Sequence, residues 1–271
     1  MKRFFSIIFF LGFLQVFAQQ NWRIRFFHEI SNREVYLYAD NDEPMPMSAK
    51  FNFKLVNLNN TLANGKIVVI PPYTKKFPIA RLSPIKVNAS NEFSYTNSYN
   101  FGDATLQTAD EDYIYDLPFT AGKSQKIYQG YNGRFSHSGE FSLDFDLKIG
   151  DEIRAAREGI VTEVIDHNTK SCPSLSCVKL SNRILIMHND GSFADYSHLK
   201  YKGTAVKKGD SVAKGQLIGY SGNTGFSSGP HLHFAVFLNR IDGKRDFIKT
   251  KFRTANGIEI LEEGKSYLKN Y

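Results

Sequence analysis

Two histidines two positions apart, His231 and His233, open a run of alternating polar and apolar residues. If this run is a β-strand, both imidazoles lie on one face, and Leu232, Phe234 and Val236 lie on the other face in a core. Imidazoles on one face can bind a metal ion, although an isolated pair is more often a polar sheet surface. The choice depends on whether other segments supply further ligands.

A second segment offers such ligands before the histidine pair. His137 precedes a predicted strand in which Ser142, Asp144 and Asp146 share the polar face. His137 and Asp144 could reach the same ion, and Asp146 is the rival carboxylate on that face. Taken alone, two such residues are more often a turn histidine and an aspartate at a strand edge.

A third segment, residues 184–199, is predicted to form a β-hairpin with Asp190-Gly191 in its turn. His198 lies near the end of its second strand and joins the candidate residues. His188, at the start of the turn, is interpreted as structural. His167, beside an aspartate and an asparagine, is interpreted as an exposed turn residue, and His28 as an isolated surface or packed histidine.

Two stretches share the order Lys-x-Gly-Asp followed by a β-branched residue, at 148–153 and 207–212. They predict two similar turn-and-strand corners in one compact antiparallel sheet or barrel. The glycines of Gly222-Asn223-Thr224-Gly225 also indicate turns, because no Lys-Ser/Thr follows and no βαβ unit surrounds them. A nucleotide-binding loop is therefore not expected.

Three stretches in this order, SHSGEFSLDF, YSHL and VKKGDSVAKGQLIGYSGNTGFSSGPHLHF, resemble the zinc metallopeptidases of the lysostaphin and LytM type. The resemblance covers roughly Tyr115 to Phe237. Matched residue by residue, it implies one zinc ion bound by His137, Asp144 and His233. It also implies His198 and His231 as the catalytic residues that do not bind zinc, and Tyr131 as a residue over the substrate.

One departure concerns the first motif, where six residues separate His137 from Asp144 instead of the three of the shorter family motif. This changes the loop between the ligands and leaves the ligand types intact. Three protein ligands leave tetrahedral zinc an open position for water, as a catalytic site requires. The resemblance implies hydrolysis of peptide bonds in the stems or cross-links of bacterial peptidoglycan outside the cytoplasm.

Two other classes of protein remain open at this point. One is a non-catalytic relative that binds the cell wall or activates a partner hydrolase, but such relatives characteristically lose metal ligands, and here all five positions are filled. The other is a biotinyl or lipoyl carrier-like fold, suggested by the two Lys-x-Gly-Asp corners. Neither corner presents a lysine in the expected exposed turn.

The fold class predicted is all-β: a compact antiparallel, barrel-like metallopeptidase domain preceded by a smaller β-sandwich-like domain. The expected divisions are a signal peptide at 1–18, an accessory domain of unknown role at 19–108, the peptidase domain at 109–252, and a strand with a polar tail at 253–271. Short alternating runs separated by Asn-, Asp- and Pro-containing turns indicate the accessory domain. The polar, aromatic stretch 97–112 carries the boundary.

The first residues are typical of an export signal, with Lys2 and Arg3, an apolar run, and a small-residue cleavage site before Gln19. The apolar run is shorter than a membrane span requires, so no transmembrane segment is expected after its removal. The protein is therefore predicted to act in the periplasm, in the cell envelope or outside the cell.

The two cysteines, Cys172 and Cys177, follow the predicted export point, so a disulfide closing a small surface loop is expected, with free thiols as the alternative. Their spacing does not match a zinc knuckle. The net charge is +7, which favours an anionic cell-wall surface. No Lys/Arg cluster interleaved with aromatic residues occurs, so nucleic acid is not an expected partner.

Overall fold

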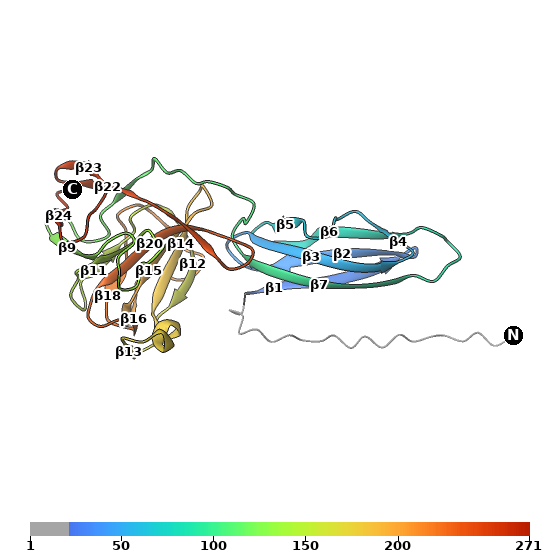
Figure 1. Cartoon of the computed structure of the whole chain (residues 1–271), viewed down its shortest axis with the longest axis horizontal. Coiled ribbons are helices and arrows are strands. Elements are labelled where there is room, and N and C mark those ends of the chain that lie inside the picture. Colours follow the sequence, from blue (N-terminus) through green and yellow to red (C-terminus); the bar gives the residue numbers. More distant parts are fainter. Residues whose placement is uncertain (1–21) are drawn as a thin grey trace.

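The computed structural model describes residues 22–271, so the predicted signal peptide lies outside the described residues. Figure 1 shows two β-rich bodies side by side, with the C-terminus at the end of the second body that is farther from the first. The chain is almost entirely β, with one short 3₁₀ helix. The predicted fold class is confirmed. No helix in residues 22–271 is long and apolar enough to cross a membrane.

The first body consists of two antiparallel sheets that pack face to face. One sheet has the order β1 (Ile24–Ser31), β2 (Glu34–Asn41), β6 (Thr74–Pro84) and β4 (Leu58–Asn60), and the other has β5 (Ile67–Ile70), β3 (Met47–Val56) and β7 (Glu92–Phe101). Leu37 and Leu82 from the first sheet meet Phe51 and Ile70 from the second in one buried cluster. Alternation of apolar and polar residues along each strand produces this core.

The second body is built on one large sheet. Its order is β17 (Ser211–Val212), β12 (Gly159–Ile165), β14 (Arg183–Met187), β15 (Phe193–Ser197), β20 (Leu232–Asn239), β10 (Ser142–Phe145), β9 (Ser124–Gln129) and β24 (Ser266–Leu268), with β21 (Arg245–Ile248) also paired to β20. The apolar face of β20 contributes Leu232, Phe234 and Val236 to the main core, as its alternation predicts.

Smaller sheets cover this one. They are β11 (Glu152–Arg154), β18 (Leu217–Ser221) and β16 (Leu199–Thr204); β23 (Gly257–Glu259), β22 (Lys251–Thr254) and β8 (Ile114–Asp116); and the parallel pair β13 (Ser171–Cys172) and β19 (Gly225–Phe226), beside the 3₁₀ helix η1 (Leu175–Leu180). The two Lys-x-Gly-Asp corners have the same geometry. In each, the aspartate accepts a hydrogen bond of 2.9 Å from the lysine N–H, at Asp151 and at Asp210.

Two segments differ from the sequence-based expectation. Residues 97–101 belong to β7, because their backbone pairs with β3 even though their side chains lack a clear period. The C-terminal residues form more than a polar tail. Strand β24 pairs with β9, Tyr267 is buried in the main core, and Lys269 donates from Nζ to the carbonyl oxygen of Leu117 at 2.8 Å. The predicted boundary at 108/109 falls in the segment between β7 and β8, and the division into domains remains a prediction.

The two bodies share a packed interface. Met45, Met47 and Phe101 of the sandwich meet Leu185, Phe193 and Phe237 of the large sheet in one buried cluster. Beside this cluster, the fully buried carboxylate of Glu43 forms an ion pair with Lys208 and accepts a hydrogen bond of 2.6 Å from the N–H of Arg23. The interface therefore contains both apolar packing and a buried, paired charge.

Candidate metal centre

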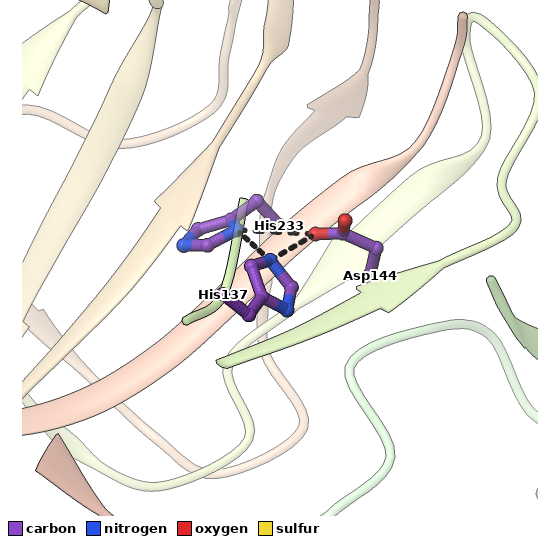
Figure 2. A group of neighbouring side chains, drawn as sticks. All are labelled: His137, Asp144 and His233. Atoms are coloured by element: carbon purple, nitrogen blue, oxygen red, sulfur yellow. Dashed lines mark hydrogen bonds and ion pairs between the residues drawn. The ribbon is translucent and has the colours of Figure 1, made fainter. Parts of the chain in front are cut away.

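Three of the predicted residues converge at one end of strands β10 and β20. Asp144 and His233 are directly opposed in the antiparallel pairing, and His137 reaches the same point from the loop before β10. Figure 2 shows both imidazole rings and the carboxylate pointing toward one position. One ligand atom from each residue lies within 4.8 Å of the other two.

The distances within this cluster fit a tetrahedral metal site. Asp144 Oδ1 lies 3.1 Å from His233 Nδ1 and 3.3 Å from His137 Nε2, and the two nitrogens are 3.2 Å apart. Ligands about 2.0–2.1 Å from tetrahedral zinc are about 3.3 Å from one another. Bond lengths to zinc would therefore require only small movements of these side chains.

The hydrogen bond of the His137 ring indicates which nitrogen is available. Its Nδ1 lies 3.1 Å from the carbonyl oxygen of Gly130. A carbonyl only accepts, so Nδ1 carries the hydrogen and Nε2 presents a lone pair to Asp144 and His233. Burial raises the pKa of Asp144, but the neighbouring imidazoles of His137 and His233 outweigh burial and hold that pKa well below the usual range. Electron-rich atoms that converge in this way suit a cation.

The rival carboxylate, Asp146, does not join the cluster. Strand β10 ends at Phe145, so Asp146 lies beyond it, and its side chain is exposed beside Lys148. The two-residue alternation on which the comparison of the two carboxylates depended therefore does not extend to Asp146.

Two further histidines, His198 and His231, lie next to the cluster. Their ring centroids are 4.6 Å apart, and His231 Nε2 lies 3.7 Å from Asp144 Oδ1. His198 follows β15 directly and has φ +66°, a left-handed conformation that is uncommon for residues other than glycine. A strained backbone held in place at such a position is typical of functional sites.

Both rings are oriented through Nδ1 by the segment 221–230. His198 Nδ1 lies 2.7 Å from the carbonyl oxygen of Thr224, and His231 Nδ1 lies 2.8 Å from that of Gly229. Each Nδ1 therefore carries a hydrogen, and each Nε2 can accept one. Burial lowers the pKa of His198 to about 3, with the nearby His231 and His233 adding to the effect, so this ring is neutral at pH 7. Burial also lowers the pKa of His231.

Glycines let this segment approach close enough to hold the rings. A Cβ on Gly222 would lie 2.4 Å from the backbone nitrogen of Lys200, and one on Gly225 would lie 2.6 Å from Cα of Ser181. The segment therefore lies against the backbone at Lys200 and at Ser181. The sequence predicted turns here, but not that the Thr224 and Gly229 carbonyls orient the two histidines.

A cleft of about 470 Å³ covers the cluster. Apolar side chains from separate segments form its rim, and charged residues lie in its wall; these are Tyr128, Phe135, Leu175, Val178 and Phe226, with Arg183, Asp195 and Arg245. Every residue that lines the cleft lies between positions 128 and 247, so the described part of the sandwich, residues 22–101, contributes none.

The charged wall centres on Asp195, a residue that the sequence did not single out. Its carboxylate accepts hydrogen bonds from Ser197 Oγ at 2.6 Å and from Arg245 at 3.1 Å. Burial raises the pKa of Asp195, but the charges of Arg245 and Arg183 outweigh burial and lower it. Alternation does place Asp195 and Ser197 on one face of β15, and this was the available signal.

The other residues considered in the sequence lie away from the metal cluster. The Tyr131 hydroxyl lies 2.8 Å from Thr250 Oγ1, and its ring packs against the main core, so Tyr128 rather than Tyr131 lines the cleft. His188 is buried, with Nδ1 2.8 Å from the carbonyl oxygen of Glu158. His167 and His28 are exposed. Cys172 and Cys177 form a disulfide beside η1.

An antiparallel sheet with two histidines and one aspartate at a strand end, and two more histidines beside them, defines a metallopeptidase-type site. The profile of Peptidase family M23 matches residues 137–244. The predicted resemblance is therefore confirmed for this part of the chain.

Named relatives agree with this assignment. Lysostaphin of Staphylococcus simulans is 38% identical over 101 residues, which are 36% of this chain and 18% of that protein. Peptidoglycan DD-endopeptidase ShyA of Vibrio cholerae is 34% identical over 95 residues, 35% of this chain and 19% of that protein. The chain spans less than a third of the length of the curated relatives it matches.

Solved structures are also similar. The catalytic domain of lysostaphin from Staphylococcus simulans is 30% identical and has a TM-score of 0.34, with 46% of this chain and 87% of that chain covered.

Proposed function

We propose that this chain is an exported zinc endopeptidase that hydrolyses peptide bonds in the stems or cross-links of bacterial peptidoglycan. The observation that carries the proposal is the set of five side chains at one strand end, three with converging ligand atoms and two with Nε2 available as a proton acceptor. Lysostaphin and the endopeptidase ShyA, to which the domain is similar, support the substrate class.

The donor set supports zinc as the metal. His137, Asp144 and His233 supply two imidazole nitrogens and one carboxylate oxygen, a set that suits zinc and leaves a fourth position for water. Zinc bound there would supply a Lewis acid that polarises a peptide carbonyl and brings the pKa of a water molecule near neutrality.

The remaining steps belong to the residues of the chain. His231, whose Nε2 is 3.7 Å from Asp144 Oδ1, is placed to take the proton of the attacking water as general base. His198 is neutral and lies 4.6 Å from His231, centroid to centroid, so it can position that water or share the role of base. The open cleft suits an extended peptide that crosses the cluster.

Metal analysis combined with digestion tests this proposal. The protein purified after export should contain about one zinc ion per chain and release soluble fragments from peptidoglycan. The His231→Ala variant should retain zinc but lose about 10²–10⁴-fold in hydrolysis rate. Absence of both zinc and digestion would disprove the enzyme, whereas bound zinc without digestion would favour a wall-binding module.

A further inference from the structure

A second pocket lies in the peptidase body, apart from the cleft. It has a volume of about 300 Å³ and is built from residues next to β8, β11, β22 and β24, the strands near the C-terminus in Figure 1. Its lining consists of Asp116, Thr120, Ala121, Arg154, Gly215, Arg253, Lys269 and Tyr271. The pocket shares none of these residues with the cleft over the metal cluster.

Positive charge exceeds negative charge around this pocket. Arg154, Arg253 and Lys269 line it, and Lys214 approaches from outside to 3.7 Å from Asp116 Oδ1. Three carboxylates lie among these four cations. Glu152 pairs with Arg154 at 2.6 Å, and Lys214 lies near Glu158 as well as near Asp116, so the set keeps one positive charge in excess.

Lys269 makes this excess of charge costly. The residue is only 3% exposed, and among the described residues its Nζ has one hydrogen-bond acceptor, the carbonyl oxygen of Leu117. An ammonium group has three hydrogens to donate. Burial lowers the pKa of Lys269 to about 8 against the opposing charge of Asp116, and the charges of Arg154 and Arg253 act in the same direction as burial. A negatively charged acceptor in the pocket would give Lys269 a second hydrogen bond and would offset the excess of positive charge around it.

The simpler interpretation is that the cations serve only to neutralise Asp116. The distances argue against a purely structural role. Arg253 contacts Asp116 Oδ1 through Nη2 alone, at 3.2 Å, and Lys214 is 3.7 Å away, so neither is a close bidentate pair. The Arg253 guanidinium lies 3.6 Å from the Tyr271 ring, which keeps it beside the pocket.

We propose that this pocket binds a phosphate-type oxyanion through Arg154, Arg253 and Lys269. The Thr120 hydroxyl, which lines the same pocket, adds a further polar group. The volume accommodates a phosphate together with part of the molecule that carries it. The anion is either a small phosphate compound or a phosphate group of an anionic polymer, and the same contacts serve both.

The test uses the full chain as purified after export. Its melting temperature and heat of binding are measured at pH 7 with sodium phosphate, with sodium acetate, and with sodium chloride at matched ionic strength. Phosphate should bind and raise the melting temperature, while chloride should not. Arg253→Gln should weaken phosphate binding about tenfold, as expected for the loss of one charge-assisted hydrogen bond. Lys269→Met should abolish binding where it folds.

Two controls locate the binding site. Lys244→Gln removes a charge that is 81% exposed at a distant turn and should bind phosphate like the wild type. His137→Ala alters the cleft and should also retain binding, which separates this pocket from any anion held at the metal cluster. Long-chain polyphosphate is compared with inorganic phosphate at equal phosphate concentration. If the natural ligand is a phosphate group of an anionic polymer, polyphosphate should bind more tightly than inorganic phosphate.

Three results would overturn the proposal. They are wild-type affinity for phosphate in Arg253→Gln, loss of phosphate binding in His137→Ala, and equal stabilisation by acetate and phosphate. None of these measurements depends on peptide hydrolysis, so a negative result would not bear on the proposed enzymatic activity.

Discussion

Asp144 and His233 are cross-strand partners in the β10–β20 pair, with Asp144 Oδ1 3.1 Å from His233 Nδ1. Because the sheet fixes this contact, loss of the His233 ring should remove a ligand that no neighbour replaces. His233→Ala should therefore retain less than about a tenth of the wild-type zinc after dialysis. His198→Ala should retain about one zinc per chain, since His198 Nδ1 bonds to Thr224. Equal loss of zinc in both variants would contradict this division of roles.

The close approach of Gly222 to the backbone predicts a positioning effect on His198. In Gly222→Ala the added Cβ would lie 2.4 Å from Lys200 N, so the segment that carries the Thr224 carbonyl must shift. We expect a fall in kcat of at least about tenfold with zinc retained, because small displacements of catalytic groups reduce rates strongly. Gly243→Ala is the matched control. Its Cβ meets open space, but its φ of +85° strains an alanine there, so it tests a destabilising glycine substitution away from the site. A similar fall in Gly243→Ala would show a general loss of stability instead.

The disulfide supports one rim of the cleft. Cys172 and Cys177 flank Leu175, and Val178 follows directly; both apolar side chains line the cleft. Replacing both cysteines with alanine should lower stability by about 2 kcal/mol, the value expected for a short closed loop. It should also raise KM for peptidoglycan fragments with little change in kcat, because the histidines and Asp144 lie on other segments. Leu175→Ala with the disulfide intact should raise KM alone, and an unchanged KM in both variants would exclude the rim from substrate binding.

His188 predicts how stability depends on pH. Burial lowers its pKa to about 4 in the folded protein, from 6.5 in an exposed histidine. The unfolded chain therefore binds more protons between these values, and stability should be complete above pH 6.5 and fall as the pH drops toward 4. The difference corresponds to about 3 kcal/mol. His188→Gln should show a smaller decrease in melting temperature from pH 7 to pH 4.5.

This comparison is made with chelator present in both proteins, because loss of bound metal at low pH would otherwise also change stability. The low pKa of His198 acts in the same direction in both proteins, so the difference between them isolates His188. Parallel pH profiles for the wild type and His188→Gln would show that His188 does not carry the effect.

Much of the site followed from the sequence because strand alternation and motif order are local properties. Alternation placed His231 and His233 on the face opposite Leu232, and the hairpin placed His198 at a strand end. Asp146 could not be rejected in this way, because the end of β10 at Phe145 depends on its pairing with the partner strands. Tyr131 was matched to a substrate position by its distance from His137, but its hydroxyl bonds to Thr250, which is 119 residues away in sequence.

The fold class was also accessible from the sequence, whereas contacts between distant segments were not. Short alternating runs indicated the sandwich, and the paired corners at Asp151 and Asp210 were recognised from their repeated letters. The C-terminal residues look polar, yet β24 completes an edge of the large sheet. Similarly, nothing in the sequence near Glu43 indicates that it is buried against Lys208.

The interface between the sandwich and the large sheet has a practical consequence for experiments. Phe193 and Phe237 lie at the ends of β15 and β20 remote from Ser197 and His233, and they are covered by Met45, Met47 and Phe101. A truncated protein that starts after the sandwich would expose this apolar surface to solvent and would be prone to aggregate. Weak activity of such a fragment would therefore be a result of its poor solubility. Enzymatic assays should use a chain that retains both bodies.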